Sequence, residues 1–184
     1  MLSGKKVVLR ALEREDLAWL HKWQNDADIM RLARSFPDHI ISKEAIGAEF
    51  EKELKGEDTG RRVFIIEEKS SGKPVGWATL RTRGYTRRMT DADVGLALGE
   101  KRAWNKGYGT ETVRLLLKEV FEQLNLHRAG WWTFAGNTAS LRLAAKMGFK
   151  EEGRLRDATF FDNRFQDLVV LGLLRDEYKP ARGE

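Results

Sequence analysis

A glycine-containing turn between a strand-like run and an amphipathic helix is the feature that most constrains this chain. The apolar run at residues 94–98 precedes the turn, and apolar residues at helical spacing follow it over residues 112–124. Between them, residues 104–111 read WNKGYGTE. A strand that turns through glycines into a helix leaves the first helical N–H groups without backbone partners, at the positive end of the helix dipole. Such a turn suits a phosphate group, and a bend that needs two permissive residues is the alternative.

The turn does not fit the two common nucleotide-binding loops. No Gly-Lys-Ser/Thr sequence follows the glycines, which excludes the loop of P-loop nucleotide hydrolases. The third glycine of the dinucleotide fingerprint G-x-G-x-x-G is also missing, because Thr112 stands at that position. A different phosphate-containing ligand is therefore needed if the turn binds phosphate.

The composition predicts a soluble globular protein with one domain over residues 1–184. Of its residues, 41% are hydrophobic and 33% are charged, and no apolar run approaches the roughly 18 residues that span a bilayer. The first ten residues lack the apolar segment of a signal peptide, so we expect no export. The chain has no cysteine, which excludes disulfides and thiolate metal sites, and its three histidines are scattered. We therefore expect a cytoplasmic protein without a metal or a membrane partner.

A basic cluster at residues 81–90 contains four arginines around Tyr85. Such a cluster can contact nucleic acid or the phosphates of a cofactor. A solvated loop between two strands is the alternative, and we favour it because no RNA-binding signature accompanies the cluster. Nucleic acid is therefore not an expected partner.

Hydrophobic periodicity gives the element order β-α-α-β-β-β-α-β-α-β-β, an α+β arrangement around one mixed sheet. The segment at residues 28–40 is expected to be irregular, because Pro37 interrupts it. Residues 162–164 are the expected turn before the last strand. Strands are predicted at 5–12, 61–69, 74–83, 93–98, 128–134, 149–155, 158–161 and 168–174, and helices follow Asp16 and span about 42–55, 110–125 and 140–147.

Two motifs, in this order of elements, resemble the GNAT superfamily of acetyl-CoA-dependent N-acetyltransferases. The first is the x-x-G-x-G turn at residues 105–109, and the second is GNTASLRLAAKMGF at residues 136–149. The ends of the chain, at residues 9–26 and 152–174, resemble the RimJ/RimL branch, which modifies protein N-termini. Spermidine and antibiotic acetyltransferases share much of this pattern.

The resemblance implies a GNAT fold, with a central mixed and largely antiparallel sheet of about seven strands, splayed in the middle and flanked by about four helices. The pantetheine arm of acetyl-CoA would lie between the strands at 96–98 and 131–134, and the amides of residues 106–110 would receive the pyrophosphate. Trp104 belongs to this segment, although we expect it to pack rather than to contact the ligand. The implied cofactor-binding residues are Leu96, Ala97, Leu98, Trp104, Asn105, Lys106, Gly107, Tyr108, Gly109, Thr110, Asn137 and Ser140.

The resemblance also implies catalytic roles for Ser140, Asn137 and Asp93. Many GNAT enzymes protonate the leaving sulfur with a tyrosine, but Ala144 stands at that position. The RimL-like pattern instead places a serine three residues after the asparagine, which matches Ser140 and Asn137. Both residues are also good helix caps, so a structural role remains open for each.

The general base is less well defined. RimL-like enzymes carry a glutamate where Thr159 stands, and other GNAT enzymes carry a carboxylate that works through water where Asp93 stands. A strand-end residue that faces solvent is the structural alternative for Asp93. Asp157 and Asp162 also stay open.

The acceptor is expected to be a primary amine, most simply the N-terminal α-amine of a protein or peptide. An α-amine with a pKa near 7.8 loses its proton at pH 7 for about 1 kcal/mol, whereas a lysine costs roughly 4.6 kcal/mol. A polyamine or antibiotic would need an acidic pocket, for which Asp26, Asp28 and Asp38 are the candidates. A CoA-binding or RNA-contacting domain without activity is the non-enzyme alternative, and a homodimer is a possible assembly.

Overall fold

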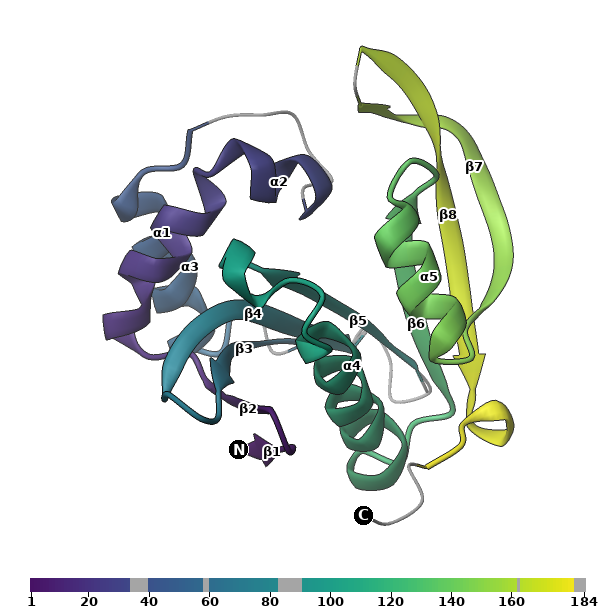
Figure 1. Cartoon of the computed structure of the whole chain (residues 1–184), viewed down its shortest axis with the longest axis horizontal. Coiled ribbons are helices and arrows are strands. Elements are labelled where there is room, and N and C mark those ends of the chain that lie inside the picture. The colour runs from purple at the N-terminus through teal and green to yellow at the C-terminus, as the bar shows by residue number, and fades with distance from the viewer. Residues whose placement is uncertain (34–39, 58–59, 83–90, 162, 181–184) are drawn as a thin grey trace.

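The computed structural model describes residues 1–33, 40–57, 60–82, 91–161 and 163–180 (Figure 1). Its centre is a mixed sheet with the strand order β1-β2-β3-β4-β5-β6-β8-β7. The pair β5–β6 is parallel and the other pairs are antiparallel. The strands are β1 (Leu2–Ser3), β2 (Val7–Ala11), β3 (Arg61–Glu68), β4 (Lys73–Thr82), β5 (Asp91–Leu98), β6 (Arg128–Phe134), β7 (Lys150–Phe161) and β8 (Arg164–Leu174).

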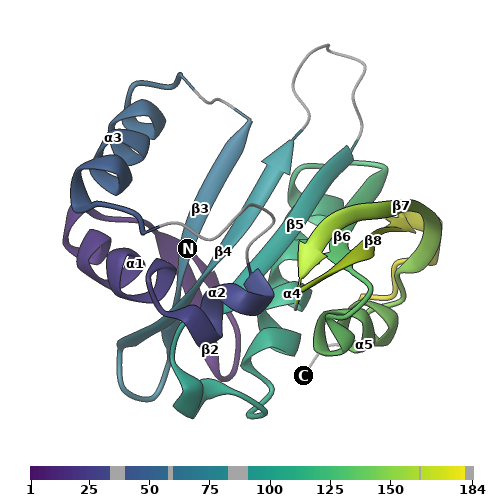
Figure 2. The same ribbon diagram turned by 90° about the horizontal axis from the view of Figure 1, so that it is seen from above.

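Helices cover this sheet on both faces. In Figures 1 and 2, α1 and α3 lie beside the β3–β4 half, α4 runs along the other face, and α5 lies beside β6. A π-helical turn, η3 (Glu119–Gln123), prolongs α4 before β6 begins. The helices are α1 (Leu17–Gln24), α2 (Ala27–Ala33), α3 (Lys43–Leu54), α4 (Tyr108–Lys118) and α5 (Thr138–Lys146), with short 3₁₀ turns η1 (Arg14–Asp16), η2 (Lys101–Ala103) and η4 (Arg175–Glu177).

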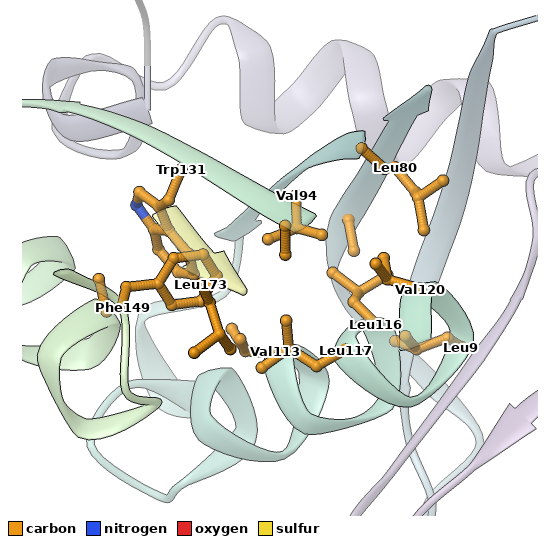
Figure 3. Packing of buried hydrophobic residues seen from close by; sticks show 14 of the residues in the cluster. Leu9, Leu80, Val94, Val113, Leu116, Leu117, Val120, Trp131, Phe149 and Leu173 are labelled. Carbon is orange, nitrogen blue, oxygen red and sulfur yellow. The ribbon is translucent and has the colours of Figure 1, made fainter. Parts of the chain in front are cut away.

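The sheet separates two hydrophobic cores. Ile65 and Ile66 are adjacent in β3 and fully buried, yet Ile66 belongs to the core under α4 and Ile65 to the core under α1 and α3. Alternate strand residues face opposite sides of a sheet, so both faces of β3 are covered. Figure 3 shows the larger core, where Leu116 from α4 and Val120 from η3 lie near Leu80 and other strand residues.

The strands β5 and β6 part soon after they meet. Their parallel register contains the pairs Asp91–Arg128, Ala92–Ala129 and Asp93–Gly130, whereas β5 continues to Leu98. Beyond Asp93 the two strands diverge, and Figure 1 shows β6, β7, β8 and α5 as a group beside the rest of the sheet. This confirms the expected splay in the middle of the sheet.

The α+β class and the mixed sheet are confirmed, but the expected counts of about seven strands and about four helices are too low. Within the described residues the sheet has eight strands, and helices α1 to α5 flank it. The extra helix α2 lies in the segment expected to be irregular, where the Asp26 carboxylate accepts hydrogen bonds from the amides of Asp28 and Ile29. The extra strand β1 is a two-residue pairing with β2.

Two expected strands near the C-terminus form one. The strand β7 runs from Lys150 to Phe161, and a register shift against β8 occurs between Leu155 and Thr159. Residues 34–39 of the segment expected to be irregular, residues 83–90 of the basic cluster at 81–90, and Asp162 of the expected last turn lie outside the described residues. The prediction of one domain over residues 1–184 stays a prediction.

Candidate functional site

Of the two glycines in the turn, only Gly107 has a positive φ, whereas Gly109 lies inside α4. Gly107 is the N-cap of α4 and has φ 86°, a left-handed conformation that favours glycine. The helix begins at Tyr108, two residues before the predicted Thr110, and the amide of Glu111 donates to the Gly107 carbonyl at 3.1 Å. The amides at 108–110 precede that first bond, so the helix itself offers them no partner.

A cavity of about 700 Å³ opens where β5 parts from β6. Residues of β4, β5 and β6 form its walls, α2 and α5 contribute from either side, and the glycine turn closes one end. Its lining consists of Asp28, Ile29, Leu32, Ala33, Trp77, Thr79, Val94, Gly95, Leu96, Ala97, Leu98, Trp104, Asn105, Gly107, Tyr108, Gly109, Thr110, Trp131, Trp132, Thr133, Asn137, Ala139, Ser140 and Leu143.

The splay thus brings most of the predicted cofactor-binding residues into one cavity. Lys106 is the exception, because it is absent from the described lining and its carbonyl accepts a hydrogen bond from Lys6 Nζ. Trp104 lines the cavity and is 37% exposed, so the expectation that it packs in the core is wrong, and its indole Nε1 donates to the Leu98 carbonyl at 3.0 Å. That bond ties the turn to the end of β5.

Tyr108 directs its side chain away from the cavity. Its hydroxyl donates to Glu68 on β3, and only 8% of the residue is exposed. Glu68 also accepts hydrogen bonds from Ser71 Oγ at 2.6 Å and from Arg102 at 3.0 Å. The bonds from Ser71, Tyr108 and Arg102 lower the pKa of Glu68 to about 2. A buried carboxylate therefore anchors the first residue of α4, whose side-chain hydroxyl is engaged by Glu68.

Ser140 lines the cavity with a hydroxyl that the protein orients. Its Oγ accepts a hydrogen bond from Trp131 Nε1 at 2.9 Å. An indole only donates, so this bond leaves the hydroxyl proton of Ser140 for another acceptor. Ala144, where the tyrosine of other enzymes would stand, is fully buried in the core and carries no polar group.

Asn137 is the N-cap of α5 and joins two elements across the cavity. Its Oδ1 accepts from the Ser140 amide at 3.1 Å, which is the capping bond. Its Nδ2 donates to the Leu32 carbonyl of α2 at 3.0 Å. The side chain is therefore engaged structurally, although it also lines the cavity.

Asp93 lies at the end of the paired part of β5, outside the described lining of the cavity. Its Oδ1 accepts from Trp132 Nε1 at 3.3 Å and lies against Gly130, where a Cβ would collide with it. Trp132 lines the cavity, so the hydrogen bond to that indole connects Asp93 to a residue of the cavity wall. The role of Asp93 as general base stays a prediction.

The other candidate bases lie on β7. Thr159 pairs with Gln166 of β8, beyond the register shift. Asp157 lies within the shift, has φ 49°, and its amide donates to Asp167 Oδ1 at 3.2 Å. Neither residue belongs to the described lining of the cavity.

Two lining residues of β4, Trp77 and Thr79, are missed by the sequence motifs. They pair with Ala97 and Gly95 of β5, and a strand paired with a ligand-binding strand shares its exposed face, so this pairing is the signal that could have found them. Trp131 and Thr133 of β6 also line the cavity, and they belong to the strand expected beside the pantetheine arm. Asp28, a candidate for an acidic pocket, lines the cavity but forms an ion pair with Lys101.

Two classes of site are missing from the part of the chain that the structure describes. No group of three or more histidine and acidic residues there is arranged to hold a metal ion. No described helix is both long and apolar enough to cross a membrane.

Comparisons with known proteins agree with this geometry. A family profile described as acetyltransferase (GNAT) domain matches residues 6–150. A spermidine N(1)-acetyltransferase of Vibrio cholerae is 27% identical over 175 residues, with 95% of this chain and 96% of the relative covered. A putative ribosomal N-acetyltransferase of Bacillus subtilis is 33% identical over 111 residues, with 60% of this chain and 59% of the relative covered.

A solved structure shares this fold over nearly its whole length. It is the crystal structure of spermidine N-acetyltransferase from Vibrio cholerae in complex with CoA and spermine. The TM-score is 0.83 at 26% sequence identity, and the alignment covers 95% of this chain and 99% of that chain.

Proposed function

Because this chain belongs to the GNAT family of N-acetyltransferases, which use acetyl-CoA as co-substrate, we propose that its acceptor is the N-terminal α-amine of a protein or peptide. One feature of the cavity carries this choice of acceptor, namely that its lining is nearly free of negative charge. In the described residues, Asp28 is the single carboxylate of the lining, and Lys101 neutralises it. The RimJ/RimL-like ends of the chain support the same acceptor.

Acetyl-CoA would lie along β5, with its pyrophosphate at the glycine turn. The amides of residues 108–110 point away from the helix they begin, and Gly107 and Gly109 keep side chains away from them. The pantetheine arm would follow the part of β5 that has left β6. This placement carries the thioester toward Ser140 and α5, at the far wall of the cavity.

The reaction is the attack of a neutral amine nitrogen on the acetyl carbonyl carbon. The N–C bond forms, the C–S bond breaks, the amine loses a proton and the thiolate gains one. Ser140 would donate its hydroxyl proton, or a hydrogen bond, to the leaving sulfur, because Trp131 already occupies an acceptor site on Oγ. Asn137 would act by holding Ser140 and α2 in place.

A polyamine acceptor is the second candidate, and the relatives favour it. The spermidine N(1)-acetyltransferases of Vibrio cholerae and Escherichia coli match 95% and 97% of this chain at 27% and 24% identity. A polyamine carries several positive charges at neutral pH, so its recognition needs several carboxylates. Binding of a polyamine in this cavity would therefore have to use at least the carboxylate of Asp28.

A panel of amines, analysed by mass spectrometry, discriminates the two acceptors. We expect acetylation of peptides at the α-amine, with little transfer to spermidine or to an aminoglycoside. The variant Asp28→Asn should leave peptide turnover within about twofold of the wild type, since a paired surface charge contributes little. Spermidine turnover that exceeds peptide turnover and falls in Asp28→Asn would replace the α-amine proposal with the polyamine one.

A further inference from the structure

The N-terminal segment is fastened to the first turn of α4. The carboxylate of Glu111 accepts hydrogen bonds from the backbone amides of Lys5, Lys6 and Val7, at 2.7 Å for Lys6 and 3.0 Å for Val7. Strand β2 also packs against α4 in the fold, as Figure 1 shows. The backbone of Lys6 is therefore fixed relative to the glycine turn, although the two are 100 residues apart in the sequence.

The side chain of Lys6 reaches that turn. Its Nζ donates to the carbonyl of Lys106 at 2.9 Å. The same ammonium lies over the N-cap of α4, because a Cβ built on Gly107 would be 3.4 Å from Nζ. Gly107 lines the cavity and Lys6 itself is outside the described lining, so the ammonium lies beside the turn that closes this end of the cavity.

A cation at this place is unfavourable for the helix itself. The N-terminus of a helix carries partial positive charge, which attracts anions and repels cations. Other cations near the turn have carboxylate partners, Lys101 with Asp28 and Arg102 with Glu68. Lys6 instead donates to a neutral carbonyl, which takes one of the three N–H donors of an ammonium.

We propose that Lys6 is a cofactor-binding residue, which places its ammonium against the phosphates of acetyl-CoA. The inference rests on the proposed placement of the pyrophosphate at the α4 turn. A phosphate there would interact with the ammonium and with the helical amides together, so that the N-terminal strand contributes to cofactor affinity. Lys106, which the motif itself singles out, has its carbonyl held by Lys6.

The test compares CoA with pantetheine, which lacks the phosphates, by calorimetry. The variant Lys6→Met keeps the length of the side chain and removes its charge. We expect its affinity for CoA to fall about tenfold, the lower end of the range for a hydrogen bond to a charged group. Its affinity for pantetheine should not change, and Lys6→Arg should restore most of the affinity for CoA.

Lys118→Met is the matched control, because it removes a lysine from the last turn of the same helix. That variant should bind CoA like the wild type. The difference between Lys6→Met and the wild type should also shrink as KCl is raised, because added salt screens an exposed charge. A structural role alone would not produce this salt dependence.

Three results would overturn the inference. Unchanged CoA affinity in Lys6→Met would exclude a phosphate contact. Equal losses for CoA and pantetheine would mean that Lys6 only shapes the cavity. A wild-type protein that binds no CoA would remove the cofactor placement and this inference together, whereas failure to acetylate peptides would contradict only the proposed acceptor.

Discussion

The indole Nε1 of Trp131 donates a hydrogen bond to Ser140 Oγ across 2.9 Å, and so joins β6 to α5 inside the cavity. Trp131 is 5% exposed and its ring meets Phe149 edge-on at a centroid distance of 5.5 Å. A packed indole is a fixed donor, and it therefore fixes the direction in which the serine hydroxyl can donate. This relationship supports the proposed role of Ser140 toward the leaving sulfur.

Replacing Ser140 by alanine should lower kcat about tenfold to a hundredfold, at or below the lower end of the usual range for general acid catalysis, since a thiolate is already a good leaving group. CoA affinity should stay nearly intact, because the serine would act on the sulfur and not on the phosphates. Steady-state kinetics and calorimetry measure the two quantities. Trp131→Phe, which keeps Oγ but removes its donor, should give a smaller loss of about fivefold. An unchanged kcat in Ser140→Ala would remove the serine from the mechanism.

Asn137 should contribute to stability through two separable bonds. Asn137→Ala removes the cap of α5 and the bond to the Leu32 carbonyl, so we expect the free energy of unfolding to fall by about 1–3 kcal/mol. Asn137→Asp keeps an acceptor for the Ser140 amide and should lose less. Thermal unfolding followed by circular dichroism gives both values. If the two variants melt together, the link from α5 to α2 contributes and the cap does not.

The carboxylate of Glu68 should stabilise the glycine turn in a pH-dependent way. Its pKa is lowered from 4.5 to about 2 in the folded protein, so folding favours the ionised form. The stabilisation is complete above about pH 5 and disappears as the pH falls toward 2. The melting temperature of Glu68→Gln should therefore be lower than that of the wild type at pH 6 and approach it at pH 3. Glu15→Gln, at an exposed position, provides the control, and a difference independent of pH would refute the assignment.

Acetyl-CoA should stabilise the fold by bridging the two parts of the divided sheet. A ligand at a hundred times its Kd adds about 2.7 kcal/mol, which corresponds to about 5–10 °C in the melting temperature of a chain of this size. Hydrogen exchange should slow in β5 beyond Asp93, where the register with β6 ends. Gly107→Val should reduce the shift, measured against its own melting temperature, because a side chain there approaches the amides of the turn. Equal shifts in both proteins would place the ligand elsewhere.

Local signals were enough to predict most of the turn and strand residues that line the cavity. Gly107 and Gly109 lie between an apolar run typical of a strand and a spacing of apolar residues typical of a helix. The run, the glycines and the helical spacing follow one another directly in the sequence. The cap at Asn137 and the serine three residues later are equally local. The helix α2 also had a local signal, the capping side chain of Asp26, but the interrupting Pro37 suggested an irregular segment.

Contacts between distant residues could not be predicted from spacing. The direction of the Tyr108 side chain depends on Glu68, which lies 40 residues away. The carboxylate of Asp93 lies over Gly130 and bonds to Trp132, and this arrangement follows from the β5–β6 register. The reach of Lys6 to Lys106 is of the same kind, since it needs β2 and α4 to be packed together.

The parting of β5 from β6 also bears on aggregation. A strand that loses its neighbour presents backbone N–H and C=O groups, and at the outer border of a sheet such groups invite another polypeptide to add a strand. Here the edge of β5 that no longer pairs with β6 faces inward, between two parts of one sheet. Residues of α2 and α5 line the same cavity. Because α2 and α5 contribute to the walls of this space, the unpaired edge is less accessible to an added strand than an edge at the outer border of the sheet would be. The fold thereby shields an unpaired backbone edge from other chains.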